Sequence, residues 1–394
     1  MPFPIFALTL TAFAMGTAEL IPNGLLPLIA SGLDVTVSRA GWVTTCFALG
    51  VMVGGPALAA STMRVPRKPL VLGMTVVFLV ANVAMTLATT LSWALVSRFV
   101  AGSMLGGFLG LGITIAVGLV PAQRQATSIA VIFLGFTISN VLSVPLGNVV
   151  GRHTGWAAAF WVVVVLAALG LVAMWLAVPD PSGEGHSESP GFAMLRNGHL
   201  WAHFVAMAFG YGGVFALYTY IAPFLTDVAG FASGSVTWIL LLFGIGVIAG
   251  NLLGGRYADR STAATTMVIL AVLAAALVTA WGFGTTNWIV LPLLVVLGVG
   301  GFGIVPPMQS YAIHISGASS TMVSALASAA FAAGIALGSA AGGAALDLND
   351  DYRMLPIVGA AMVLLGLLTF AANHRSHTGR RSSMHEAPHE FADA

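Results

Sequence analysis

The chain has 394 residues, of which 58% are hydrophobic and only 7% are charged. Because a soluble domain carries roughly 25% charged residues, this composition excludes a soluble fold and indicates a protein embedded in a lipid bilayer. The net charge of +1 gives no information on acidic partners. No basic stripe with interleaved aromatic residues is present, so we expect no nucleic-acid binding.

The first apolar stretch, from Phe3 to Ala30, is long enough to cross a bilayer and contains one charged residue, Glu19. A charged side chain at the centre of a membrane costs at least ~2.5 kcal/mol, so this acid must be protonated, paired or facing water. No Lys or Arg precedes the stretch, and its hydrophobicity continues past Glu19. We therefore expect it to be retained rather than cleaved as a signal peptide.

Charged residues and Pro/Gly punctuation divide the sequence into twelve apolar runs, each about the length that a helix needs to cross ~30 Å of hydrocarbon. The sequence therefore predicts an all-α membrane protein with twelve transmembrane helices. The runs lie near residues 4–30, 40–60, 69–90, 91–119, 126–150, 156–178, 199–226, 236–256, 262–283, 286–311, 318–346 and 354–373.

The longest connection, residues 179–197, is polar, acidic and rich in Pro, Gly and Ser, and it divides the chain almost in half. We expect a six-helix half at 1–178, a cytoplasmic loop at 179–197 and a second six-helix half at 198–373. The polar, His-rich tail at 374–394 shows no periodicity, and we expect it to be disordered.

Basic residues accumulate on one side of the predicted membrane. With the N-terminus placed inside, the outer loops hold only Arg39, Arg152 and Arg353, which predicts that both termini are cytoplasmic. The ten basic residues of the inner loops and tail are Arg64, Arg67, Lys68, Arg124, Arg196, Arg256, Arg260, Arg375, Arg380 and Arg381.

The two halves look duplicated. A shift of roughly 195 residues places the end of the second run, Gly54 to Lys68, near the end of the eighth, Gly250 to Arg260, and lays SVPLG on GSAAG. Two pseudo-symmetric halves with a binding site at the midplane are an architecture of secondary transporters.

Four stretches carry a resemblance to a known family: AELIPNGLLPLIASGLDVTVSRAGWVTTCFALG, GGPALAASTMRVPRKPLVLG, RFVAG, and GFTISNVLSVPLGNVVGRHTGWAAAFW. They resemble the major facilitator superfamily, specifically its twelve-span drug:proton antiporter branch, and within it bacterial chloramphenicol efflux and arabinose-type exporters. The likeness extends to about Asn373. It implies a monomer of the bacterial plasma membrane that needs no cofactor and exports small amphiphilic compounds in exchange for protons, the proton gradient being the energy source.

Two departures from the family pattern concern its loop after the second span and its fifth-span motif. Ala59, Ala60 and Ser61 occupy the neighbourhood in which the family usually has an acid, and an acid remains only in the second half, as Asp259. In the fifth span, Ser143 replaces a usual glycine beside the proline. A gate that uses both halves equally is therefore put in doubt.

Glu19 and Arg98 are the residues we expect to couple transport to protons. Counting residues along the first and fourth spans places them at one depth, and the resemblance places these spans side by side. A charge-assisted hydrogen bond between the side chains, direct or through water, is then expected. Two alternatives are a static buried ion pair and an arginine that binds backbone carbonyls of the first span.

Other residues are candidates for a substrate cavity. Asn23 shares a helical face with Glu19, and Pro22 and Pro27 on either side of it allow the span to bend; a capping role for Asn23 at a local kink is the alternative. Aromatic residues with a polar neighbour suit a poorly water-soluble ligand, although packing or lipid contact is the ordinary role of such rings. The candidates are Phe133, Phe136, Asn140, Tyr211, Phe215, Tyr218 and Phe331.

Candidates for conformational gating fall into two groups. Gly135, Pro145 and Gly147 make the fifth span a close-packing, bendable helix, which would pack against the eighth span of the other half. The residues at the inner ends of the second and eighth spans determine topology and, by the resemblance, also stabilise one conformation: Gly55, Arg64, Arg67, Lys68, Gly255, Asp259 and Arg260.

The motifs that define several other classes of protein are absent from the sequence. The only lysine, Lys68, is not part of a GxxxxGK[ST] phosphate loop, and it lies outside the spans, so a nucleotide-driven pump and a retinal protein are excluded. HExxH and GxSxG are absent, and His199 and His203 lack a third ligand, so we expect no protease, no other enzyme and no metal site. An exporter of sugars or nucleosides and a channel remain as alternatives.

Overall fold

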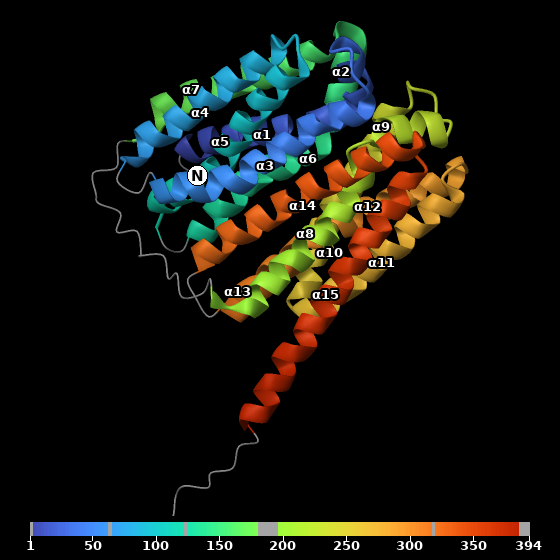
Figure 1. Cartoon of the computed structure of the whole chain (residues 1–394). Coiled ribbons are helices and arrows are strands. Elements are labelled where there is room, and N and C mark those ends of the chain that lie inside the picture. The colour runs from blue at the N-terminus through green and yellow to red at the C-terminus, as the bar shows by residue number, and fades with distance from the viewer. Residues whose placement is uncertain (1–2, 62–64, 122–123, 180–195, 317–319, 386–394) are drawn as a thin grey trace, which may run out of the picture.

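The computed structural model describes residues 3–61, 65–121, 124–179, 196–316 and 320–385. Within these ranges every regular element is a helix, and twelve helices or helix pairs are long and apolar enough to cross a membrane, as predicted. Figure 1 shows the two halves packed side by side. The all-α fold with twelve spans in two halves is thereby confirmed.

The first half contains the six predicted spans, and the first of them is divided into three helices. Its elements are α1 (Phe3–Leu20), η1 (Ile21–Gly24), α2 (Leu26–Gly32), α3 (Val37–Ser61), α4 (Arg67–Thr86), α5 (Leu91–Gly118), α6 (Gln125–Thr154) and α7 (Trp156–Ala177).

The second half also contains six spans. Its first and fourth spans, the seventh and tenth of the chain, are interrupted. Its elements are α8 (Gly198–Tyr218), α9 (Ile221–Pro223), the π-helix η4 (Phe224–Val228), α10 (Val236–Ala258), α11 (Thr262–Phe283), α12 (Asn287–Gly303), α13 (Val305–Ser316), α14 (Ser320–Asn349) and α15 (Met354–His385). We call the end of the bundle that holds the starts of α1 and α8 the inner end, and the end that holds α2 and α9 the outer end (Figure 1).

The predicted bend in the first span is a complete break. α1 stops at Leu20, a short 3-10 helix follows at Ile21–Gly24, and α2 begins with Pro27 in its first turn. Each proline lacks the N–H that would continue the hydrogen-bond ladder, which accounts for both interruptions. Carbonyl groups at the end of α1 therefore need other partners.

The last helix is longer than predicted. We expected the span to end near residue 373 and a disordered tail from 374 onward, but α15 continues to His385. No proline lies between Pro356 and Pro388, so nothing in the sequence forbids the helix from continuing at the membrane boundary. The remainder of that tail, and most of the predicted loop at 179–197, lie outside the described residues.

Equivalent helix crossings in the two halves confirm the duplicated register. In α3 and α5, glycines abut backbone of the facing helix, and in α10 and α12 they do the same. Small residues allow backbones in lipid to approach this closely. The matching glycines lie 196 positions apart in the chain: Gly50 and Gly246, Gly54 and Gly250, Gly102 and Gly298.

Two helix pairs make most of the contacts between the halves: α3 with α14, and α6 with α10. The predicted contact between the fifth and eighth spans is thus present, but Gly135 and Gly147 do not make it. They face Thr9 of α1 and Ile21 of η1, and the close approach to α10 occurs where Val141 meets Gly244. The motif glycines therefore tighten the first half internally, because they lie on a different face of α6 from Val141.

Candidate functional site

Glu19 lies in the last turn of α1, inside the bundle and not on a lipid-facing surface. Its side chain is 8% exposed, and its carboxylate neither accepts a hydrogen bond from a described residue nor forms an ion pair with one. A carboxylate in the membrane interior without a protein partner is a group whose charge depends on a proton or on water.

Arg98 of α5 is completely buried and is held by backbone and aromatic rings. Its Nε donates to the Val43 carbonyl at 3.3 Å, and its Nη2 donates to the backbone carbonyl of Glu19 at 3.5 Å. The guanidinium carbon lies 4.1 Å from the ring centre of Phe47 and 5.7 Å from that of Phe160. These cation–π contacts partly replace the hydration that burial removes.

No direct hydrogen bond joins the Arg98 and Glu19 side chains, so the direct form of the expected contact is absent from the described residues. The arginine instead binds backbone carbonyls of α1 and α3, which was one of the two alternatives considered. The break after Leu20 explains this choice, because it deprives the last carbonyls of α1 of regular helical partners. Arg98 is too deeply buried to line a cavity, although its charge lies within electrostatic range of Glu19.

Asn23 fastens the broken end of α1 to α3. The Thr44 hydroxyl donates to Asn23 Oδ1 at 3.0 Å, and the asparagine is 0% exposed. This arrangement fits a structural role at the break in α1 rather than contact with a substrate.

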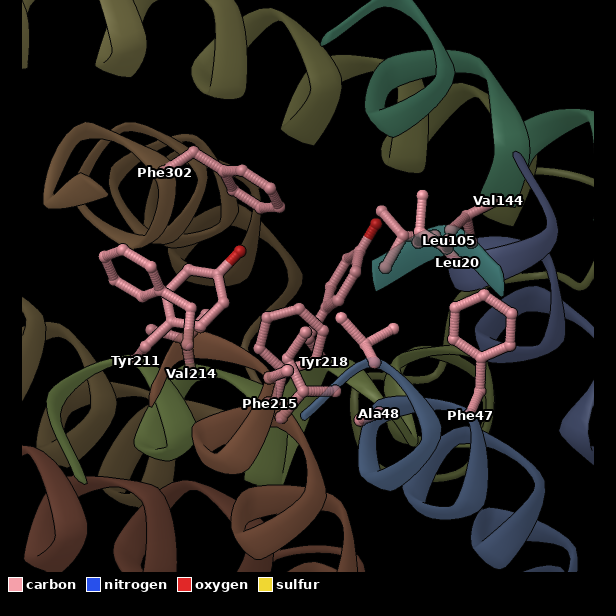
Figure 2. Close-up of a cluster of buried hydrophobic side chains, with 14 of the residues drawn as sticks. Leu20, Phe47, Ala48, Leu105, Val144, Tyr211, Val214, Phe215, Tyr218 and Phe302 are labelled. Carbon is pink, nitrogen blue, oxygen red and sulfur yellow. The ribbon is translucent and has the colours of Figure 1, made fainter. Parts of the chain in front are cut away.

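An aromatic cluster of the second half, defined by Tyr211, Phe215, Tyr218, Phe243, Phe302 and Phe331, lies on α8, α10, α12 and α14. Tyr218 and Phe243 stack with ring centres 4.5 Å apart, and Tyr211 lies 5.0 Å from both Phe215 and Phe331. Neither tyrosine hydroxyl donates a hydrogen bond to a described group. Figure 2 shows the two hydroxyls turned to the same side of the cluster.

Four members of this aromatic cluster were predicted, and two were missed. Tyr211, Phe215 and Tyr218 repeat at helical spacing along α8 and share one face. Phe243 and Phe302 come from other helices, where no local pattern distinguishes them. The duplication offers one signal for Phe243, because it lies 196 positions after Phe47, the ring that contacts Arg98.

The carboxylate of Glu19 and the aromatic cluster face each other across the boundary between the halves. Glu19 lies within electrostatic range of the Tyr211 hydroxyl. One side of this region therefore offers a titratable group, and the other offers rings and hydroxyls. A ligand between them would meet both.

The three remaining cavity candidates occupy different environments. Asn140 is 6% exposed, and its Oδ1 has no hydrogen-bond partner. Phe136 packs beside Gly16 of α1. Phe133 is 40% exposed on α6, and its place in the cavity stays a prediction.

Interactions between the predicted gating residues are absent from the described part of the chain. Arg67, Lys68 and Asp259 form no ion pair with a described residue, and Arg260 lies 5.8 Å from the ring centre of its neighbour Tyr257. Gly55 approaches Gly106 of α5, Gly255 has open space beside it, and Pro145 lies inside α6. Arg64 lies outside the described residues, and the gating role of this set stays a prediction.

The halves are joined at their outer end by contacts that we call the outer clasp. Ser38 of α3 donates to the Asp347 carboxylate of α14, and the Ser339 hydroxyl donates to the Gly41 carbonyl at 3.1 Å. Tyr220 donates to the Ser339 carbonyl at 3.0 Å and packs against Gly41. No pattern in the sequence indicated these residues.

Twelve spans in duplicated halves, with a buried carboxylate and an aromatic cluster between them, define a membrane transport protein rather than an enzyme. The sequence profile of the Major Facilitator Superfamily matches residues 8–324 and 230–393. The chain belongs to this superfamily, as the sequence analysis expected.

Relatives and a solved structure agree with this assignment. The chain is 32% identical to the inner membrane transport protein YdhP of Escherichia coli over 93% of this chain and 94% of the relative. It is 35% identical to a chloramphenicol resistance protein of Streptomyces lividans over 71% and 72% of the two chains. A bacterial homologue of the lysosomal transporter Spinster, solved in an inward-facing and occupied conformation, shares the fold with a TM-score of 0.75, 16% identity and coverage of 94% and 96%.

Proposed function

We propose that this transporter is a proton-coupled antiporter that exports a small amphiphilic compound from the cytoplasm. The observation that carries the proposal is Glu19: a carboxylate in the membrane interior, at the boundary of the halves, that no described protein group satisfies. An exchanger needs one group that binds and releases a proton as the site opens to one side and then the other.

Arg98 supports this role because its hydrogen bonds go to backbone carbonyls and leave the carboxylate of Glu19 unoccupied. Since its guanidinium binds the backbone of α1 and α3, it keeps a positive charge near Glu19 without occupying the carboxylate. The carboxylate can then exchange its proton without breaking a salt bridge. A static ion pair, the structural alternative, would instead need direct contact between the two side chains.

The aromatic cluster supports an apolar substrate with a few hydrogen-bonding groups. The six rings contact one another, and the polar groups near them include the Tyr211 and Tyr218 hydroxyls and the Glu19 carboxylate. Such a site suits an aromatic or otherwise amphiphilic compound better than a sugar or nucleoside, which would need more hydrogen-bond partners. The resistance named for the Streptomyces relative makes chloramphenicol the first compound to test.

A channel, the alternative of a different class, would have a continuous open pore. The outer clasp opposes this reading, since it joins the halves at one end through Ser38, Gly41, Tyr220, Ser339 and Asp347. An alternating-access cycle would open this clasp and close the inner end in turn.

Replacing Glu19 by glutamine tests the proposal. Glu19→Gln keeps the shape and hydrogen-bonding capacity but removes the titratable proton, so substrate binding and substrate-for-substrate exchange should survive. Accumulation of substrate in proteoliposomes driven by a pH gradient should disappear.

Asp34→Asn, a matched change in the loop between α2 and α3, serves as the control and should accumulate substrate like the unchanged protein. Accumulation by Glu19→Gln equal to that of the Asp34 control would show that coupling runs through other groups. Loss of exchange as well as accumulation would indicate a binding role instead.

We also propose that both termini lie in the cytoplasm. Ten of the thirteen basic loop and tail residues fall on that side of the predicted topology, which is the expected bias. A reporter that is active only in the cytoplasm, fused after the last residue, should be active. A periplasmic reporter at the same position should be silent, and the reverse result would invert the orientation.

A further inference from the structure

A groove lies at the inner end of the second half, far along α8 and α15 from the aromatic cluster. It has a volume of about 900 Å³ and lies where α8 begins and the membrane-spanning part of α15 ends. Its depth is therefore that of the membrane–water boundary. Its walls include Arg196, His199 and Ala202 on the α8 side and Thr369, Ala372 and Ser376 on the α15 side.

Hydrogen bonds between the two helices hold the groove open in a fixed shape. His199 Nδ1 and Asn373 Oδ1 lie 2.8 Å apart, and Asn373 Nδ2 donates to the His199 carbonyl at 2.9 Å. Asn197 Nδ2 donates to the Ile315 carbonyl at 3.2 Å, which connects the start of α8 to α13 as well. These side chains are already held by hydrogen bonds. Binding of a ligand would therefore not carry the entropic cost of ordering the groove walls.

The mouth of the groove is positively charged. Arg196 is exposed and makes no hydrogen bond or ion pair with a described residue. Arg375, also exposed, adjoins the lining residue Ser376, and none of the described residues that line the groove is acidic. An anionic group is therefore the complementary ligand at this end.

Toward the membrane interior, both walls become apolar and remain exposed. Val205 lies three positions beyond Ala202 on α8 and is 44% exposed, and Leu365 lies four positions before Thr369 on α15 and is 50% exposed. This spacing keeps each residue on the face that lines the groove. Trp201, 49% exposed, has the amphipathic side chain typical of the boundary between hydrocarbon and headgroups.

We propose that this groove binds an anionic glycerophospholipid from the leaflet at the inner end, with its phosphate at Arg196 and an acyl chain along Val205 and Leu365. A cationic mouth followed by an apolar strip matches the two parts of such a lipid, and basic pockets between helices at the membrane boundary suit anionic headgroups. A soluble phosphate compound would use the mouth alone and leave the apolar strip without a role.

Native mass spectrometry of the full chain in detergent, with phosphatidylglycerol or phosphatidylcholine of identical acyl chains, tests the proposal. Phosphatidylglycerol should bind more tightly. Arg196→Gln should weaken it about fivefold, the effect of one basic residue near a membrane surface, and leave phosphatidylcholine unchanged. Arg256→Gln removes an equally exposed charge from the inner end of α10 and should have no effect.

A second variant tests the space inside the groove independently of its charge. Ala372→Leu fills the space without changing any charge, so it should weaken binding of both lipids, with thermal unfolding confirming that the protein remains folded. Equal binding of the two lipids by the unchanged protein, or equal losses in Arg196→Gln and Arg256→Gln, would overturn the proposal. Displacement of phosphatidylglycerol by equimolar glycerophosphate would overturn the lipid assignment in favour of a soluble phosphate.

Discussion

The two halves of this transporter share their packing but not their chemistry. In the first half, Arg98 of α5 lies over the Phe47 ring and binds the backbone of Glu19. Positions 196 residues later hold only apolar side chains, each at most 2% exposed. The matched residues are Glu19 and Phe215, Phe47 and Phe243, and Arg98 and Leu294.

This difference shows how duplication allows specialisation. Glycine crossings at equivalent positions preserve the shape of both halves, so side chains that do not form the crossings are free to diverge. Among the described residues, the buried charges Glu19 and Arg98 lie in the first half, and the aromatic cluster lies in the second. A binding region between the halves then combines two kinds of surface that neither half offers alone.

The largest effect on transport is expected when Arg98 is replaced by leucine, the residue at the equivalent position of the second half. Arg98→Leu should reduce transport in proteoliposomes to the level of empty liposomes, because the positive charge beside Glu19 is lost. The free energy of unfolding should change by less than about 2 kcal/mol, since a buried charge is itself costly and only its backbone acceptors lose a partner. Thermal unfolding in detergent, measured on the same preparation, separates the two effects.

Retention of transport by folded Arg98→Leu protein would show that this arginine is only structural. The reciprocal change, Leu294→Arg, places a charge in the second half, where the carbonyl of Phe215, equivalent to that of Glu19, already accepts a hydrogen bond from the Thr219 N–H. It should destabilise the protein by ~2.5 kcal/mol or more. Similar free energies of unfolding for Arg98→Leu and Leu294→Arg would mean that the halves tolerate a buried charge equally. That result would contradict the difference between the halves.

An intermediate effect should appear equally in both halves. Gly102→Ala and Gly298→Ala each place a methyl group against backbone of the facing helix, at Phe47 and Phe243 respectively. Each should lower the free energy of unfolding by about 1–3 kcal/mol through overpacking. Gly110→Ala, on the same helix as Gly102 but facing open space, is the control and should be close to neutral. Unequal losses at the two crossings would contradict equivalent packing.

The smallest expected effect concerns the chemistry of the second half. Tyr218→Phe removes a hydroxyl that bonds to no described group and preserves the stack on Phe243. The free energy of unfolding should change by less than about 0.5 kcal/mol, while KM for the exported compound should rise about two- to tenfold if one hydrogen bond to substrate is lost. Tyr257→Phe, at an exposed ring, should leave KM unchanged. Identical KM values would remove Tyr218 from the substrate site.

Most of the fold could be predicted from the sequence because it follows from local patterns. Hydropathy defines each span, Pro22 and Pro27 define the break in the first, and the glycine repeat defines the duplication. Glu19 could be identified for the same reason, as a single charge within a long apolar run. The three aromatic residues of α8 share a helical face, which the sequence also displays.

The rest depends on how helices from distant parts of the chain meet. Which acceptor Arg98 selects depends on the unpaired carbonyls at the break in α1, and a linear sequence does not show which helices surround a given side chain. The outer clasp likewise joins Gly41 to Ser339, which lie almost 300 positions apart.

The outer clasp has a consequence for how the protein responds to its surroundings. Its contacts join hydroxyl groups to backbone carbonyls, and its single formal charge, Asp347, is paired with the neutral Ser38 rather than with a cation. Dissolved ions weaken attraction between opposite charges, but they have little effect on hydrogen bonds between neutral groups. The outer clasp should therefore open at a rate that is nearly independent of ionic strength.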